Sequence, residues 1–143
     1  MDNGRMNYPA VVVAGIVYWL VQAAWYTALS AQWMAAIGKT KEQLGQGGDS
    51  PMPYIVSLVC DIVLAFAIAW VVSQGSEQSA ARGVSVAALL WLGLVVTTME
   101  TNYIFERRPA TLLAINGGSS LIGMLIMGAI VGGWKKKAKA AKA

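Results

Sequence analysis

The chain has 143 residues, enough for one modest domain, and 57% of them are hydrophobic, against roughly 45–50% in soluble domains. Charged residues make up 13%, about half of the usual ~25%, which is too few to cover a water-soluble surface and excludes intrinsic disorder. With a net charge of +4, no histidine and one cysteine, the chain lacks an intrachain disulfide, an iron–sulfur cluster and imidazole ligands, so we expect no cofactor and no metal.

Four apolar stretches have the ~20-residue length that crosses a bilayer, and each has to be a helix because lipid cannot satisfy backbone polar groups. They run from about 9 to 31, 54 to 73, 84 to 103 and 110 to 134. The sequence therefore predicts an all-α fold of a single domain over residues 1–143. This domain is an integral membrane bundle of four transmembrane helices in up-down-up-down order, with both termini on the same side. Residues 135–143 form a lysine-rich tail that fits anionic lipid headgroups, and no motif supports nucleic-acid binding.

The connections carry the evidence for orientation. The first, about 32–53, opens with a segment, 33–44, that we expect to form one interfacial helix with Lys39 and Lys41 outward and Trp33 toward the lipid. The third, about 104–109, is a tight hairpin in which Pro109 suits the start of the last helix.

The basic residues are distributed unequally between the two sides of the membrane. The side of the termini holds seven of them: Arg5, Arg82, Lys135, Lys136, Lys137, Lys139 and Lys142. The other side holds four: Lys39, Lys41, Arg107 and Arg108. The positive-inside rule then predicts cytoplasmic termini.

Polar side chains inside the spans recur at helical spacing, which places them on shared faces. These rows are Tyr18, Gln22 and Tyr26; Ser57 and Asp61; Thr98, Asn102 and Glu106; and Asn116 and Ser120. Asp61 and Asn116 each lie seven residues from the outer end of their helix, or ~10 Å at 1.5 Å per residue. All four helices thus bring polar groups to a similar depth, which predicts one polar site that opens outward.

Asp61 is the most informative residue, because a carboxylate at that depth costs ~2.5–3.5 kcal/mol unless it is paired or neutral. It is either an acid that handles a proton or a ligand, or a structural group. In the second case it bonds Gln22, Asn116 or a tyrosine, or pairs with Arg108, and locks the bundle. Glu100 is the other candidate for acid–base chemistry, although it lies near the membrane surface. Trp25 and Tyr26 either wall a ligand pocket or pack as anchors.

The fourth helix has small residues at the spacing of close helix contact. Gly128 and Gly132 form a GxxxG motif, which serves either packing inside the bundle or a docking face for a second copy or another membrane protein.

The second half of the chain carries a specific combination of motifs. These comprise Thr97, Thr98 and Asn102, then Phe105, Glu106, Arg108 and Pro109, then Leu112, Ile115 and Asn116, then 126–130. The run 90–134 resembles the family of small membrane proteins known as domain of unknown function 1761, and the opening segment with Trp25 and Tyr26 is also similar. The resemblance implies a four-helix, mostly bacterial membrane protein without established activity, and it supplies no catalytic residues.

Together these observations predict a multi-pass protein of the bacterial inner membrane that binds a small amphipathic or lipidic ligand, or a partner, in its outer polar pocket. The expected ligand-binding residues are Gln22, Trp25, Tyr26, Asp61, Asn102, Glu106, Arg108 and Asn116. Arg108 would meet an anionic group of the ligand. One alternative is a cofactor-independent, isomerase-like membrane enzyme with Asp61 and Glu100 as acid and base. Another is an accessory subunit that docks through Gly128 and Gly132.

Overall fold

The computed structural model describes residues 6–45 and 50–136, and every regular element in these ranges is helical. Four helices are long and apolar enough to cross a membrane. They are α1 (Tyr8–Ala28), α4 (Met52–Ser73), a third span over Ala80–Phe105, and α7 (Ala110–Gly133). The expected all-helical class with four membrane-length helices is confirmed. Arg5 and the lysines after Lys136, which contribute to the predicted orientation, lie outside the described residues.

Local sequence signals set where the helices begin. Asn7 caps α1, because its side-chain oxygen accepts from the backbone N–H of Ala10 at 3.3 Å. Ser79 caps α5 (Ala80–Leu90) in the same way, by accepting from the N–H of Arg82 at 3.2 Å. Pro109 is extended and starts α7, since a proline has no N–H to leave unsatisfied there.

The first connection differs from the single interfacial helix expected over 33–44. The structure has two short helices instead, α2 (Ser30–Ile37) and α3 (Lys41–Gly45). Gly38 separates them, because its φ of 68° is left-handed and its N–H turns back to Ala35 and Met34. Thr40 and Gln43 then cap each other's backbone N–H groups and start α3. The prediction of one continuous helix was wrong for this reason.

The third span contains a feature that the apolar pattern does not reveal. Between α5 and α6 (Thr97–Phe105) lies a π-helical segment, η2 (Trp91–Val96). A π-helix has wider turns than an α-helix, so it changes the direction in which the following side chains point. Trp91 ties this segment to α7, since its Nε1 donates to Gly117 O at 3.1 Å and to Ser120 Oγ at 3.0 Å.

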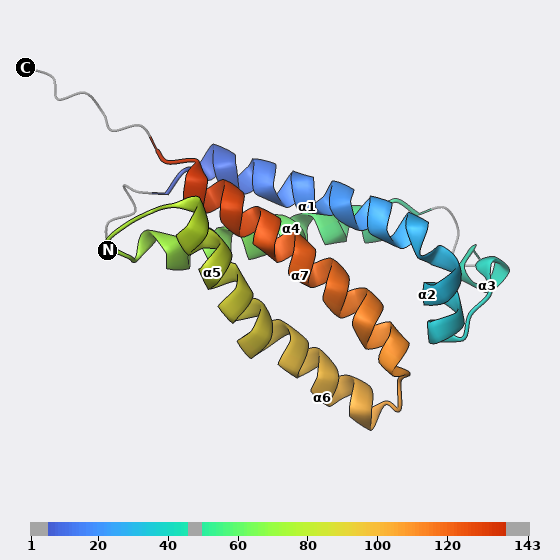
Figure 1. Cartoon of the computed structure of the whole chain (residues 1–143). Coiled ribbons are helices and arrows are strands. Elements are labelled where there is room, and N and C mark those ends of the chain that lie inside the picture. Colours follow the sequence, from blue (N-terminus) through green and yellow to red (C-terminus); the bar gives the residue numbers. More distant parts are fainter. Residues whose placement is uncertain (1–5, 46–49, 137–143) are drawn as a thin grey trace, which may run out of the picture.

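Helix α7 lies at the centre of the bundle, between α5 on one side and α1 with α4 on the other (Figure 1). Its core contacts are apolar and belong to Met124, Met127 and Val131, which pack with Ile68 and Val72 of α4. Toward the hairpin at residues 106–109, α6 diverges from α1, and its contacts are with η2 and α7 (Figure 1).

Small residues allow α5 and α7 to approach very closely. A Cβ added to Gly83 would lie 1.8 Å from the carbonyl oxygen of Gly128, and one added to Gly132 would lie 2.3 Å from that of Ser79. We call this contact the glycine seam (Gly83, Gly128 and Gly132). Of the two uses that the GxxxG motif leaves open, packing inside the bundle is the one seen in the chain.

Hydrogen bonds show which helix ends lie together. Asn7 Nδ2 donates to Trp134 O at 3.2 Å, and Gln78 Nε2 donates to Val131 O at 2.8 Å. Arg82 Nε donates to Val72 O at 3.4 Å. The starts of α1 and α5 and the ends of α4 and α7 thus share one end of the bundle. The start of α4, α2 and the hairpin at 106–109 lie at the opposite end, which we call the hairpin end (Figure 1).

Candidate functional site

A cavity of about 610 Å³ opens at the hairpin end, where α1, α2, α4 and α7 converge. Its walls are Trp19, Gln22, Ala23 and Tyr26 of α1, Trp33 of α2, Pro53, Tyr54 and Ser57 of α4, and Asn116 of α7. We call it the aromatic pocket, because four of these nine residues are aromatic. Its volume lies within the ~300–1,000 Å³ of small-molecule sites.

Gln22 connects the aromatic pocket to Asp61. Its Nε2 donates to Asp61 Oδ1 at 3.2 Å, so the two residues predicted to meet on α1 and α4 do so. Asp61 is 5% exposed, and its Oδ2 has no hydrogen-bond partner among the described residues. The bond to Gln22 is one of those expected if Asp61 is a structural group, while the second oxygen leaves this buried carboxyl incompletely satisfied.

A second set of hydrogen bonds joins three helices through Asn116. Tyr26 Oη donates to Asn116 Oδ1 at 2.9 Å, and Asn116 Nδ2 donates to Tyr103 Oη at 2.8 Å. Both ends of the amide are therefore engaged, with α1 on one side and α6 on the other. This connection holds the divergent α6 in place and fixes the orientation of the Tyr26 ring.

The two tryptophans of the pocket are held differently, Trp19 by hydrogen bonds and Trp33 by a ring contact. Trp19 Nε1 donates to Tyr54 O at 3.1 Å and to Ser57 Oγ at 3.0 Å. The rings of Tyr26 and Trp33 meet edge to face, with centroids 5.8 Å apart and planes at 72°. Trp33, expected to face lipid, is thus a wall of the pocket. These side chains line the pocket with aromatic surface.

Trp25 lies outside the walls of the pocket. Its Nε1 donates to Ile115 O at 3.0 Å, and its ring covers Gly118, where an added Cβ would lie 3.1 Å from the ring. Of the two uses that the sequence allows, this geometry matches packing between α1 and α7.

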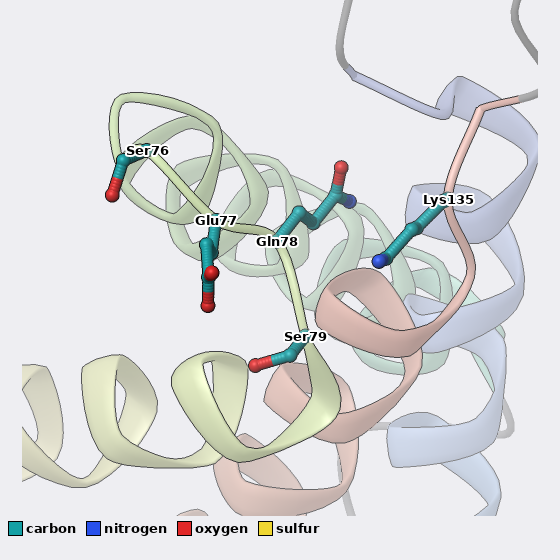
Figure 2. Close-up of a pocket in the computed structure, with 5 residues that line it drawn as sticks. All are labelled: Ser76, Glu77, Gln78, Ser79 and Lys135. Carbon is teal, nitrogen blue, oxygen red and sulfur yellow. The ribbon is translucent and has the colours of Figure 1, made fainter.

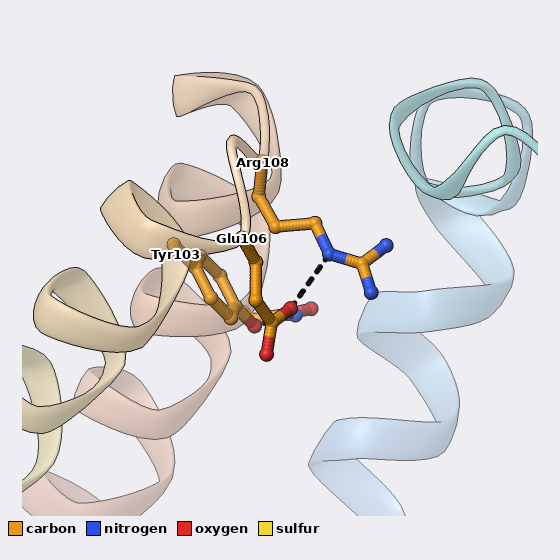
Figure 3. A network of polar contacts seen from close by, with 4 residues as sticks. Tyr103, Glu106 and Arg108 are labelled. Atoms are coloured by element: carbon orange, nitrogen blue, oxygen red, sulfur yellow. Dashed lines mark hydrogen bonds and ion pairs between the residues drawn. The ribbon is translucent and has the colours of Figure 1, made fainter.

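The hairpin residues form a separate group. Arg108 Nε lies 2.8 Å from Glu106 Oε2, and Figure 3 shows this ion pair at the turn. Both side chains are exposed, and Arg108 lines a small cavity of about 120 Å³ with Glu100 and Tyr103. Asn102 is exposed on α6 and lines neither this cavity nor the aromatic pocket. The structure therefore places Gln22, Tyr26 and Asn116 on one pocket, with Asp61 bonded to Gln22. Glu106 and Arg108 lie beside Tyr103, the hydrogen-bond partner of Asn116, and like Asn102 they are not among the walls of that pocket (Figure 3).

The two carboxylates considered for acid–base chemistry do not share a cavity. Asp61 is reached through Gln22 of the aromatic pocket, whereas Glu100 lines the small hairpin cavity. A mechanism with Asp61 and Glu100 as acid and base needs both groups within reach of one substrate, and the structure does not place them on the walls of one cavity. Within residues 6–45 and 50–136, no group of three or more His, Cys, Asp or Glu side chains is placed to hold a metal ion.

A third cavity, of about 430 Å³, lies at the other end of the bundle. Its walls are Ser76, Glu77, Gln78 and Ser79 of the α4–α5 connection and Lys135 after α7. Figure 2 shows the side chains of Gln78 and Lys135 extending toward each other while Glu77 points away from Lys135. This is a polar loop surface, and it lacks the apolar walls of a small-molecule site.

Six wall residues are absent from the ligand-binding set expected from the sequence: the aromatic residues Trp19, Trp33 and Tyr54, and also Ala23, Pro53 and Ser57. Trp19 gave a usable signal, since it lies three residues before Gln22 and so shares the face of the polar row. Trp33 gave none, because its position depends on the break between α1 and α2 at Leu29.

The comparisons with known proteins agree with the sequence resemblance. The model of the family described as "Protein of unknown function (DUF1761)" matches residues 9–132, which includes all four spans except their outermost residues. No curated protein and no solved structure matches the chain.

Proposed function

The chain belongs to the DUF1761 family of proteins of unknown function, and on that premise we propose that it is a membrane protein that binds a small amphipathic ligand in the aromatic pocket. The observation that carries the proposal is the pocket itself, in which aromatic rings and a few polar groups from four helices converge. Ligand sites combine largely apolar walls with a small number of placed polar groups in this way.

The position of the pocket supports an amphipathic ligand. The walls near the surface come from the start of α4, at Pro53 and Tyr54, while Gln22 and Asn116 lie deeper along α1 and α7. A molecule with an apolar body and a polar group therefore has matching surfaces at different depths.

Native mass spectrometry of gently extracted protein tests the proposal, with two variants that each add one tryptophan. Ala23→Trp fills the aromatic pocket, because Ala23 is one of its walls. Leu89→Trp adds the same side chain to an exposed position of α5, where Leu89 is 69% exposed. We expect the wild type and Leu89→Trp to retain a bound small molecule that Ala23→Trp has lost. A wild type without bound mass, or a bound mass that survives Ala23→Trp, would contradict the proposal.

We further propose that the protein lies in a bacterial inner membrane with its termini in the cytoplasm. The support is the distribution of charge: Arg82, Lys135 and Lys136 lie at one end of the bundle, and Arg5 and the remaining tail lysines are adjacent to that end in sequence. Lys39, Lys41, Arg107 and Arg108 lie at the hairpin end. The positive-inside rule places the more basic end in the cytoplasm.

A further inference from the structure

We propose that the ligand of the aromatic pocket is an organic cation with apolar substituents, held by the ring faces of the pocket and attracted by the carboxylate of Asp61, which lies behind the wall residue Gln22. This inference rests on the proposed function, and it replaces the anionic group expected from Arg108. Three independent features of the pocket support it: the charges around it, its aromatic surfaces and its hydrogen-bond donors.

The walls of the pocket carry no positive charge, and one of them contacts a carboxylate. None of the nine wall residues is basic, and the wall residue Gln22 donates a hydrogen bond to Asp61. Among the described residues, the ion pair found is Arg108 with Glu106, at the hairpin. Asp61 thus has no counter-cation of its own in the described chain. A buried carboxylate is stabilised when an opposite charge comes near it, and a cationic ligand would supply that charge.

The aromatic surfaces suit a cation. Tyr26 and Trp33 meet edge to face, and Trp19 is fixed by its hydrogen bonds to α4. The face of an aromatic ring is electronegative, so it attracts an ammonium or a related cation, most strongly when water is excluded. Rings that converge on one cavity from α1, α2 and α4 are the arrangement by which proteins recognise quaternary ammonium groups.

The polar side chains of the inner pocket make hydrogen bonds within the protein. Gln22 donates to Asp61, Tyr26 donates to Asn116, and Ser57 donates to Tyr54 O at 3.0 Å. The strongest anion sites use a charged donor such as arginine or lysine, and the walls provide no basic side chain. The inner pocket therefore presents acceptors, a nearby carboxylate and ring faces, all of which favour positive charge.

Three probes test the sign of the charge: tetraphenylphosphonium (cation) and tetraphenylborate (anion), which have nearly the same size, and the smaller triphenylphosphine oxide (neutral). Their binding is measured by quenching of tryptophan fluorescence and by calorimetry in dodecyl maltoside micelles, with protein-free micelles as the blank. We expect the phosphonium to bind at least about tenfold more tightly than the oxide, and the borate to bind least. A factor of ten in affinity corresponds to about 1.4 kcal/mol.

Two variants that each remove one negative charge test whether Asp61 is the carboxylate that attracts the phosphonium. Asp61→Asn keeps an oxygen that accepts from Gln22 and removes the charge. Glu77→Gln removes one charge from the loop at the other end of the bundle and is the matched control. We expect Asp61→Asn to weaken phosphonium binding about tenfold and to leave the oxide unchanged, while Glu77→Gln changes neither. Because the wild type alone reports the order of the three probes, the test holds even when a variant folds poorly.

The outcomes separate this inference from the proposed function. Equal binding of phosphonium and oxide, or tighter binding of borate, overturns the cation inference and leaves a pocket that binds amphipathic molecules. If no probe binds, the cation inference fails, and the loss or survival of the co-purified mass in Ala23→Trp decides the proposed function separately.

A short-chain phosphatidylcholine added below its micelle concentration distinguishes two sources of the cation. If it displaces the phosphonium, the source is a choline headgroup; if it does not, the source is a free organic cation.

Discussion

Asn116 is the residue on which the geometry of the pocket depends most directly. Its amide is engaged at both ends, by Tyr26 of α1 and by Tyr103 of α6. Interhelical hydrogen bonds of this kind contribute about 0.6 kcal/mol on average in membrane proteins, with a maximum of ~1.7 kcal/mol. The energy is modest, and the larger effect of the residue is to set the position of one pocket wall.

Tyr26→Phe tests this contribution by removing the hydroxyl that donates to Asn116 Oδ1. We expect the free energy of unfolding to fall by about 0.6 kcal/mol, and by no more than ~1.7 kcal/mol. Tyr54→Phe is the matched control, because Tyr54 is 67% exposed and its hydroxyl has no hydrogen-bond partner among the described residues. The free energies of unfolding of both variants and of the wild type are measured in a series of mixed detergents. Equal stabilities for the two would show that the Tyr26–Asn116 bond contributes nothing.

Some residues of the site follow from the sequence and others do not, for physical reasons. Helical spacing places Gln22 and Tyr26 on one face, and depth places Asp61 and Asn116 at one level, so their meeting was predictable. Arg108 was expected at the same place, but it belongs to a turn whose direction the sequence does not determine. In the structure it is paired with Glu106.

The lengths of the four membrane-spanning helices follow from hydropathy, whereas the breaks and the π-helical segment in the helices do not. The break at Leu29 and the left-handed Gly38 divide the region after α1, and η2 widens the third span. Apolar composition is the same for an α-helix and a π-helix, so no count of hydrophobic residues distinguishes them. Tertiary contacts, such as those of Trp91 with α7, decide between them.

Because α5 and α7 touch at the glycine seam, we expect one methyl group added there to lower the stability of the protein strongly. Gly83→Ala would place a Cβ 1.8 Å from the carbonyl oxygen of Gly128, so the two backbones have to separate. Overpacking of this kind costs about 1–3 kcal/mol, and more where backbone rather than side chain has to move. We expect a clear fall in the temperature of unfolding, measured in detergent by scanning fluorimetry.

Gly93→Ala is the control for the seam. No atom lies within 4 Å of a Cβ added at Gly93, so this variant is expected to be as stable as the wild type or slightly more stable. If Gly83→Ala and Gly93→Ala unfold at the same temperature, the close approach of α5 and α7 is not a source of stability.

For the molecule as a whole, burial is uneven along the chain. The last span is 44% buried over its most apolar window and the third span 11%, so α7 is the centre and the third span lies at the edge. This arrangement leaves most of the surface of the four spans to the lipid, and it concentrates the polar groups of the spans at the hairpin end.

The proposed orientation predicts which loops a membrane-impermeant maleimide reaches in intact cells. Single cysteines are introduced in a Cys60→Ser background, one as Thr40→Cys at the hairpin end and one as Ser76→Cys in the α4–α5 connection. Thr40→Cys is expected to react, and Ser76→Cys only after the membrane is permeabilised. The reverse pattern would place both termini outside the cytoplasm.

The glycine seam also determines how the pocket can change shape. The backbones of α5 and α7 touch without side chains between them, so no flexible side chains allow the two helices to slide past each other. We therefore expect α5 and α7 to move as one rigid unit, which includes Asn116, the pocket wall contributed by α7. Helix α1 is also packed closely on α4, where a Cβ added to Gly15 would lie 2.9 Å from the Ile62 backbone. Under the proposed function, we therefore expect entry and exit of a ligand to depend on movement of α2, which carries Trp33 and joins α1 through the break at Leu29.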